Sequence, residues 1–294
     1  MIDRRRMMVG LGGVLAVGSV RHVAAQERGE GERFGEVLDR LERRSGGRLG
    51  VAIRDGGGGS LMRRADERFP MASTFKALAA AAVLARVDAG LERLDRRVAV
   101  VQADLVDYSP VMATRVVGEA PSLAEICAAA ITVSDNTAGN LLLDAVGGPE
   151  GLTAFLRASG DAVTRLDRRE PALNEAAPGD PRDTTTPAAM AATVERLLFG
   201  DVLTAASRAR LVGWMEADAV AGALLRAGLP KDWWIADKTG AGGNGARSIV
   251  AAVRPPGRGP VVMAINLAET TLSLAERNAV FAEIAAAWVR SLVV

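Results

Sequence analysis

Residues 74–89 are apolar on nearly all sides of a helix, and Gly90 follows them. A helix that is hydrophobic all round must be buried, so this stretch predicts a helix in the middle of a domain. Lys76 is the only charged residue between Arg68 and Arg86. The rest of the chain has to surround this helix, and 294 residues with 49% hydrophobic content can build such a core in one large or two closely associated domains.

The two ends of the chain predict a shared sheet. Residues 34–44 have helical spacing, and residues 49–54 predict a short strand that ends in the glycine run 56–59. Near the other end, a capping box at Ser273 predicts a final helix. Three strands are expected before it, at 233–239, 248–253 and 261–267. They should form one antiparallel sheet, with the final helix packed on it.

The middle of the chain is mainly helical. A capping box at Ser122 predicts one helix, residues 137–145 continue the pattern, and a further helical stretch is expected around 193–212. Residues 161–187 are charged and rich in turn residues, without a clear period. A segment of that length without regular structure inside a compact protein is usually functional, disordered or misassigned.

These elements predict an α+β fold. An antiparallel sheet is flanked by helices from both chain ends, a helical domain is inserted, and the active site lies between the two. The expected boundaries are 26–64 and 216–294 for the α/β sheet domain and 65–215 for the all-α domain.

Residues 1–25 contain, in order, the three regions of a secretory signal peptide: a charged one, an apolar one and one of small residues. Three consecutive arginines from Arg4 precede the apolar stretch 7–20, and small residues end at Ala25. Cleavage is expected after Ala25, and both the Sec and the twin-arginine routes fit. No other run approaches the roughly 20 apolar residues that a transmembrane helix needs. We therefore expect an exported protein, periplasmic or secreted, with no membrane contact in its mature form.

Composition excludes several classes of function. Residues 1–25 hold four arginines and one aspartate, so the remaining chain has 32 basic and 34 acidic residues and a formal net charge of −2. This balance, with 4% aromatic residues, leaves no surface for nucleic acid. The single histidine, His22, lies in the expected signal peptide, so the mature chain can build neither a Ser-His-Asp triad nor a histidine zinc site. No cofactor and no metal are expected.

Cysteine and lysine are scarce as well. Cys127, the only cysteine, stands in an apolar segment and cannot form an internal disulfide, so we expect it in the core. Three lysines, Lys76, Lys231 and Lys238, stand against 33 arginines. Lysine, unlike arginine, can release its proton when it is buried or close to another cation. Lysines at motif positions in such a chain therefore favour a chemical role.

The first motif is Ser73 with Lys76, three residues apart on one face at the start of the buried helix. The alternative is a helix cap with a lysine that reaches solvent. Because an unpaired buried ammonium would cost several kcal/mol, Lys76 should be paired or partly neutral. Either state would activate Ser73.

Two further motifs are weaker when each is taken alone. Ser134-Asp135-Asn136 occupies a break between helices, where Asp135 is expected to cap the following helix. Lys238-Thr239-Gly240 lies on a predicted strand, and the alternative is a solvated lysine on an edge strand.

In this order the three motifs resemble those of class A serine β-lactamases and penicillin-binding proteins. The run Arg-Leu-Asp-Arg-Arg-Glu-Pro-Ala-Leu-Asn-Glu-Ala at 165–176 is similar to the omega loop of class A β-lactamases, expected over about 165–183. Residues 214–218 and 235–242 resemble the family too, so the likeness covers nearly all of 34–290. It implies hydrolysis of the β-lactam amide bond of penicillins and cephalosporins through an acyl-serine intermediate, which confers resistance.

The resemblance implies a role for each catalytic residue. Ser73 attacks the lactam carbonyl, and the backbone N–H groups of Ser73 and Ala241 hold the oxyanion. Ser134 passes a proton to the leaving nitrogen. Either Lys76 or Glu170, acting through water, takes the proton from Ser73, and this choice stays open.

Glu170 separates a hydrolase from a protein that is merely acylated. By the resemblance, Glu170 with Asn174 beside it holds the water that hydrolyses the ester. Arg168 and Asp183 are similar to the ion pair that closes the omega loop. The alternative for them is a surface pair worth under about 1 kcal/mol.

The resemblance also implies a set of substrate-binding residues: Asn136, Lys238, Thr239, Gly240, Arg247 and Tyr108. Arg247 would receive the substrate carboxylate together with Lys238 and Thr239. Tyr108 would form a cleft wall, although it could also belong to a simple turn. Two positions depart from the family. Ala80 stands where many relatives have a cysteine bridged to the equivalent of Cys127, and Arg169 replaces a tryptophan.

Two other functions share part of this chemistry. A D,D-peptidase that acts on cell-wall peptides uses the same serine, lysine and Lys-Thr-Gly residues, and the glutamate loop argues against it. A sensor or scavenger would be acylated and stay acylated, and a sensor would normally need a membrane anchor. The expected partners are small-molecule β-lactams, and the chain is expected to be a monomer.

Overall fold

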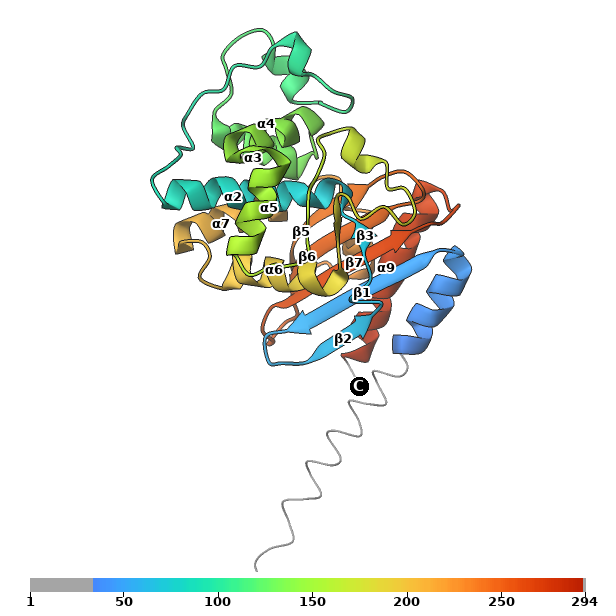
Figure 1. The fold of residues 1–294 in the computed structure, drawn as a ribbon. Coiled ribbons are helices and arrows are strands. Elements are labelled where there is room, and N and C mark those ends of the chain that lie inside the picture. Colours follow the sequence, from blue (N-terminus) through green and yellow to red (C-terminus); the bar gives the residue numbers. More distant parts are fainter. Residues whose placement is uncertain (1–33, 293–294) are drawn as a thin grey trace, which may run out of the picture.

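The computed structural model describes residues 34–292, so the expected signal peptide lies outside the described residues. Figure 1 shows a sheet with helices on both faces. The strand order is β2-β1-β7-β6-β5, and every neighbouring pair is antiparallel. The strands are β1 (Arg48–Asp55), β2 (Ser60–Arg63), β5 (Trp234–Ala241), β6 (Arg247–Arg254) and β7 (Val261–Ala268). Strands from both ends of the chain share one antiparallel sheet, which confirms the predicted α+β class.

Helices from the two chain ends cover one face of this sheet (Figure 1). They are a helix over residues 34–45 and α9 (Leu274–Ser291), with the short α8 (Leu225–Gly228) against α9. Ser273 begins α9 with the predicted capping box, because its hydroxyl accepts the Glu276 N–H and the Glu276 carboxylate accepts the Ser273 N–H. A cap of this kind stabilises a helix by about 1 kcal/mol.

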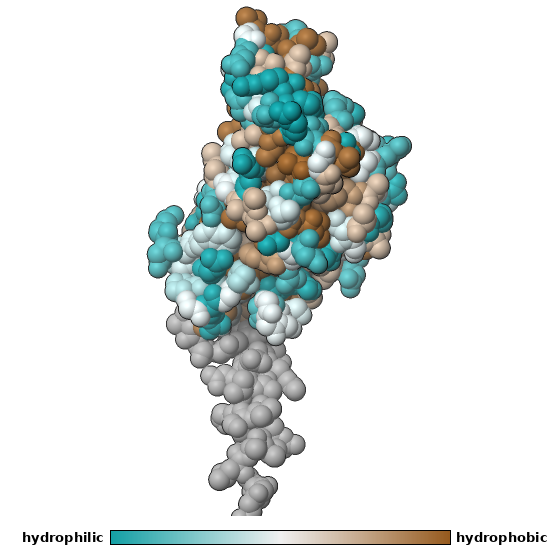
Figure 2. Space-filling view, turned by 90° about the vertical axis from the view of Figure 1, so that its left-hand side faces the viewer, coloured by the Kyte–Doolittle hydropathy of each residue, from teal (hydrophilic) through white to brown (hydrophobic). Residues whose placement is uncertain are grey.

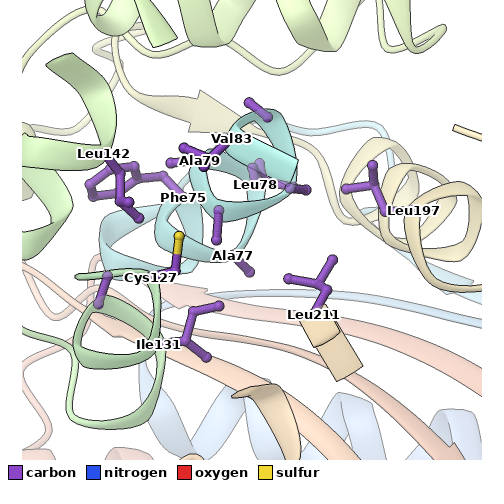
Figure 3. Close-up of a cluster of buried hydrophobic side chains, with 14 of the residues drawn as sticks. Phe75, Ala77, Leu78, Ala79, Val83, Cys127, Ile131, Leu142, Leu197 and Leu211 are labelled. Atoms are coloured by element: carbon purple, nitrogen blue, oxygen red, sulfur yellow. The ribbon is translucent and has the colours of Figure 1, made fainter. Parts of the chain in front are cut away.

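The other helices lie on the opposite face and beside it (Figure 1): α2 (Phe75–Asp88), α3 (Leu123–Thr132), α4 (Asn136–Val146), α5 (Gly148–Ala158), α6 (Pro187–Phe199) and α7 (Ala205–Glu216). Helix α2 is buried along residues 75–84, as its sequence predicts. Figure 3 shows Leu78 of α2 among Ile131, Leu142 and Leu211 from the surrounding helices. Burial of one such leucine stabilises the fold by about 1.5–3 kcal/mol.

Cys127 lies in the same core, as predicted, and its side chain is fully buried (Figure 3). Burial raises the pKa of its thiol, so the reactive thiolate form is disfavoured. Ala80 of α2 is also fully buried, which places both positions of the absent family disulfide in the apolar interior.

The prediction of one helical stretch around 193–212 is wrong, because the structure has two helices there. Helix α6 ends at Phe199, and Gly200 follows in an extended conformation. A Cβ at Gly200 would lie 2.7 Å from the Arg196 carbonyl oxygen, so only glycine allows this sharp exit. Thr204 then caps α7 by accepting the Ser207 N–H. The break lets α6 pack on β1 and β7 while α7 packs on α2 and β5.

Residues 89–122 form long loops at the top of the molecule in Figure 1, with two short 3-10 turns, η2 (Gln102–Asp104) and η3 (Met112–Arg115). Large hydrophobic side chains are exposed along this segment: Leu91, Val101, Tyr108 and Val117. Figure 2 shows hydrophobic residues gathered in the upper part of one face, among hydrophilic ones. Within residues 34–292, no helix combines the length and the apolar character needed to cross a bilayer.

Candidate active site

Ser73 lies in a 3-10 turn, η1 (Ala72–Thr74), that leads directly into α2. Its side chain is buried, and Lys76 Nζ donates a 2.9 Å hydrogen bond to Ser73 Oγ. The serine and the lysine therefore face each other across one helical turn, as their spacing predicts. The alternative of a helix cap with a solvated lysine is wrong, because the Lys76 side chain is fully buried.

Three residues around the site have positive φ angles, which non-glycine residues rarely adopt. They are Ala72 at +44°, Tyr108 at +61° and Ser134 at +60°. Each such conformation costs on the order of 1–3 kcal/mol and persists only where the surrounding structure holds it. In this conformation the Ser134 hydroxyl lies 3.5 Å from Lys76 Nζ and 3.2 Å from Lys238 Nζ.

Lys76 has a complete set of polar partners. Its Nζ lies 2.6 Å from Asn136 Oδ1, 2.8 Å from the Ser134 carbonyl oxygen and 3.0 Å from Glu170 Oε1. Burial lowers the pKa of Lys76, and the neighbouring Glu170 carboxylate opposes that shift. Lys76 was predicted to be paired or partly neutral, and the structure shows it paired. These partners come from two segments of the chain outside its own helix.

The Ser-Asp-Asn segment links α3 to α4. The Asp135 carboxylate accepts the N–H groups of Ala138, Val111 and Met112 at 2.8–2.9 Å, so Asp135 caps α4 and holds the preceding loop, as expected. Asn136 donates from Nδ2 to the Asp107 carbonyl oxygen, which orients its Oδ1 towards Lys76. Asp135 is thus structural, while its two neighbours face the site.

Glu170 is buried and its carboxylate faces the serine, since Oε1 lies 3.4 Å from Ser73 Oγ. Asn174, in the short η4 turn (Ala172–Asn174), donates to Glu170 Oε2 at 2.5 Å. Within residues 34–292, no group donates a hydrogen bond to the buried Asn174 Oδ1. The carboxylate that faces the serine and the neighbouring amide oxygen form a setting that can hold and deprotonate a water molecule.

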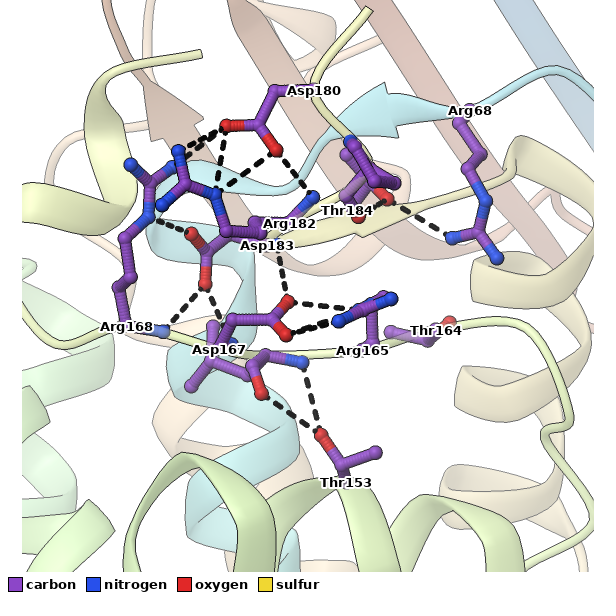
Figure 4. Close-up of polar contacts among 12 residues, drawn as sticks. Arg68, Thr153, Thr164, Arg165, Asp167, Arg168, Asp180, Arg182, Asp183 and Thr184 are labelled. Carbon is purple, nitrogen blue, oxygen red and sulfur yellow. Dashed lines mark hydrogen bonds and ion pairs between the residues drawn. The ribbon is translucent and has the colours of Figure 1, made fainter. Parts of the chain in front are cut away.

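The omega loop is closed by a polar network at its base (Figure 4). Arg168 Nε donates to Asp183 Oδ2 at 2.5 Å, and Asp183 Oδ1 accepts the backbone N–H groups of Asp167 and Arg168. Asp183 is 1% exposed and Arg168 16%, so the alternative of a surface pair is wrong. The short strands β3 (Phe69–Pro70) and β4 (Thr184–Thr185) pair beside this network and join the loop to the segment before Ser73.

Asn140 on α4 was not predicted. Its Oδ1 accepts the Glu170 N–H at 2.9 Å, and its Nδ2 donates to the Glu170 carbonyl oxygen at 3.0 Å. One side chain thus satisfies both backbone groups of Glu170. The available signal was its position four residues after Asn136, which places both asparagines on one helical face.

Lys238 lies on β5, the edge strand of the sheet, but its side chain is fully buried. Its Nζ donates to Ser134 Oγ at 3.2 Å and to the Thr239 carbonyl oxygen at 2.9 Å, and lies 3.9 Å from Asp218 Oδ2. The alternative of a solvated edge-strand lysine is therefore wrong. Burial lowers the pKa of Lys238 to about 8, although the Asp218 carboxylate opposes the shift.

Gly240 allows β5 to approach the serine closely. A Cβ at this position would lie 2.9 Å from the Ser73 backbone nitrogen and 2.7 Å from the Met71 carbonyl oxygen. Any side chain here would push the strand and the serine turn apart. Ala241 follows at the end of β5.

Arg247 begins β6 opposite Ala241 and is buried. It donates to the Gly240 carbonyl oxygen at 2.9 Å and to Asn278 Oδ1 on α9 at 2.8 Å. Burial, reinforced by the nearby Arg277, lowers the pKa of Arg247 to about 10. Asn278 is a further residue that the sequence did not indicate.

Two of the predicted residues make fewer contacts. Tyr108 is 59% exposed, and its carbonyl oxygen accepts the Asn136 N–H, so its backbone touches the site while its ring faces outward. Thr239 is buried and contributes its carbonyl oxygen to Lys238. Within residues 34–292, no three His, Cys, Asp or Glu side chains come together in a way that would hold a metal ion.

The Ser73 hydroxyl is bonded to Lys76 and faces the Glu170 carboxylate, and a second buried lysine lies next to Ser134. These groups define a hydrolase that acts through an acyl-serine without an imidazole. The chain matches the model of the β-lactamase enzyme family over residues 33–292. It belongs to this family, as a class A serine enzyme. It hydrolyses the β-lactam amide bond and so confers resistance to β-lactams.

Solved structures agree with this assignment. The class A β-lactamase of the last common ancestor of Gram-negative bacteria is 58% identical, with a TM-score of 0.87, over 88% of this chain and 99% of that chain. An ancestral class A β-lactamase is 59% identical, with a TM-score of 0.86 and the same coverage, 88% and 99%. PenP from Rhodopseudomonas palustris, assigned to the same class, is 49% identical, with a TM-score of 0.86 over 88% and 99% of the two chains.

Proposed function

We propose that Ser73 is the nucleophile of this β-lactamase and that it attacks the carbonyl carbon of the lactam. The observation that carries the proposal is the position of Ser73 Oγ, 2.9 Å from Lys76 Nζ and 3.4 Å from Glu170 Oε1. Both groups are close enough to receive the serine proton, directly or through one water, so the acylation base is left as either of them. The backbone N–H groups of Ser73 and Ala241 are proposed to hold the oxyanion.

The leaving nitrogen needs a proton when the amide bond breaks. Ser134 is the proposed donor, because its hydroxyl lies 3.2 Å from Lys238 Nζ and 3.5 Å from Lys76 Nζ. A hydroxyl between two lysines can pass its proton on and be reprotonated by either of them. The product of this step is an ester between Ser73 and the opened lactam.

Hydrolysis of that ester is assigned to Glu170 with Asn174. The Glu170 carboxylate takes a proton from a water whose oxygen bonds to the acyl carbon, and the Ser73 Oγ–carbon bond breaks as the proton returns to the serine. Asn174 Oδ1 supports this assignment, because it accepts no hydrogen bond from residues 34–292 and can accept the second hydrogen of that water. The facing carboxylate also separates this chain from a D,D-peptidase and from a sensor that stays acylated.

Penicillins and cephalosporins are the proposed substrates. Their carboxylate would be received by Lys238, Thr239 and Arg247, and the rest of the molecule would contact Asn136, Gly240 and Tyr108. The direct test is hydrolysis of a chromogenic cephalosporin and of a penicillin by purified residues 26–294. Turnover without accumulation of a stable adduct is expected. A stable adduct without turnover would mean a scavenger if cell-wall peptides are left intact, and a D,D-peptidase if a cell-wall peptide is cleaved.

The affinity for the substrate carboxylate should depend on the charge of Lys238. With a pKa of about 8, this lysine is charged at lower pH and loses its proton as the pH rises through that value. We therefore expect KM to rise about tenfold above pH ~8. A tenfold loss of affinity is the effect of losing one charge-assisted hydrogen bond. Steady-state kinetics against pH would measure this. The variant Lys238→Arg, which stays charged, should lose this rise. A parent profile that is flat through the pKa would contradict the proposal.

The Arg168–Asp183 pair is proposed to hold the omega loop in place. The Asp183 carboxylate accepts three hydrogen bonds, and Asp183→Asn removes its charge. Unfolding in urea should therefore show a free energy of unfolding about 2 kcal/mol lower than that of the parent. Release of the acyl group should also be slower. Asp95→Asn, which breaks the exposed Arg93–Asp95 pair, is the matched control and should change neither. Equal behaviour of the two variants would contradict the role.

Three further proposals concern the whole chain. Residues 26–64 with 216–294, and residues 65–215, are proposed as the two domains, with the site between them. The chain is proposed to act as a monomer. Class A β-lactamases are generally exported, and residues 1–25 are proposed to be cleaved off on export to the periplasm or the medium. Light scattering and N-terminal sequencing of the mature protein would test the last two.

A further inference from the structure

One face of α4 contacts the catalytic residues at two successive turns and the residue before Glu170 at a third. Asn136, Asn140 and Asp144 are spaced four residues apart, so their side chains project from the same face. Asn136 contacts Lys76, and Asn140 contacts both backbone groups of Glu170. Asp144, one turn further, continues this row towards the omega loop.

The partner of Asp144 is Arg169, the residue directly before Glu170. Arg169 Nη2 lies 2.7 Å from Asp144 Oδ1, and its Nη1 lies 3.5 Å from the Asn140 carbonyl oxygen. The preceding residue, Arg168, points instead to Asp183 at the base of the loop. The two consecutive arginines therefore fix the backbone before Glu170 in two directions. Arg168 binds it to the base of the loop, and Arg169 binds it to α4.

The two ion pairs differ in their access to solvent. Asp183 is almost fully buried, whereas Arg169 and Asp144 are 43% and 58% exposed. An exposed pair is weak and is screened by salt, so its effect should be small and should depend on ionic strength. This difference allows the contribution of the α4 pair to be measured separately.

We propose that Asp144 and Arg169 are positioning residues for ester hydrolysis, which act by holding the backbone of Glu170 against α4. The inference rests on the proposed role of Glu170 as the base that activates water. A general base must lie within hydrogen-bond reach of the water proton, so a small shift of residue 170 slows the step. Because the ion pair is exposed, it makes the rate of deacylation sensitive to salt.

The test is the lifetime of the penicilloyl ester, measured by quenched flow and intact mass. Arg169→Gln and Asp144→Asn should each lengthen it about two- to fivefold at low salt, the range for an exposed pair. In about 1 M salt, where screening acts over about 3 Å, the difference from the parent should disappear. Two variants keep an ion pair at this place: Arg169→Lys, and the double variant Arg169→Asp with Asp144→Arg. Both should deacylate at nearly the parent rate, and a loss of side-chain packing alone would not give this recovery.

The matched control is the Arg44–Glu283 pair, which is similarly exposed but joins the helix 34–45 to α9 away from the site. Arg44→Gln should leave the lifetime unchanged in both salts. Parent-like lifetimes in Arg169→Gln and Asp144→Asn, or a slowing that persists in high salt, would overturn the inference while the proposed function stands. A parent enzyme that forms no ester on Ser73 would overturn both.

Discussion

Glu170→Ala is expected to acylate with penicillin and then stay acylated, with deacylation slowed by about 10²–10⁴. The reason is geometric, because the Glu170 carboxylate faces Ser73 beside the Asn174 side chain, and alanine leaves nothing at this position to deprotonate the water. Intact mass spectrometry should show the protein plus one whole penicillin molecule, since opening of the lactam releases no fragment.

The control for this prediction is Glu175→Ala on the same loop. The Glu175 side chain is 55% exposed and pairs with Arg168, so this variant removes a loop carboxylate without touching the serine. It should turn over penicillin without accumulating an adduct. Rapid turnover by Glu170→Ala itself would contradict the assigned role. Slower formation of the adduct would show that Glu170 also serves in acylation, and the adduct should still accumulate.

Ser73→Ala is expected to lose hydrolysis by about 10⁶, because the residues of such a site act as one unit and the nucleophile forms the covalent bond. Lys76 keeps its partners Ser134, Asn136 and Glu170 in this variant, so the fold should be retained. Steady-state hydrolysis of a chromogenic cephalosporin and intact mass would give the two readouts. No adduct should form.

A suitable control is Ser207→Ala, which removes a buried hydroxyl that donates to Asp88. Asp88 is the last residue of α2, at the opposite end of this helix from Ser73. It should keep the parent rate constants, with only a modest loss of stability. Hydrolysis that is equal in Ser73→Ala and in the parent would exclude Ser73 as the nucleophile and, with it, the whole acyl-serine mechanism.

Much of the fold could be predicted because its signals are local. The four long strands begin and end within one or two residues of the predicted bounds, since alternation and turn residues mark them directly. The break at Gly200 was missed, because a single glycine within an apolar pattern does not distinguish a kink from a helix end. That distinction depends on the strands against which α6 packs.

The site, too, could be predicted in part from local signals, while the rest depended on contacts between distant segments. A buried lysine beside a serine had to be paired or partly neutral, and this followed from the cost of an isolated charge in an apolar run. The identity of its partners did not follow, since Glu170 reaches Lys76 only because the omega loop folds back over α2. Asn140 and Asn278 escaped prediction because an asparagine on a helix carries no signal until the segment that it contacts is known.

By itself the sequence determined most of the helices and the four long strands, and it leaves residues 26–294 without a histidine, because periodicity, capping residues and composition belong to the chain alone. Only the tertiary structure decided that Lys238 is buried on an edge strand, that Asp183 lies inside the loop base, and that Arg169 contacts α4. These are contacts between distant segments, and their burial depends on how the helices pack against the sheet.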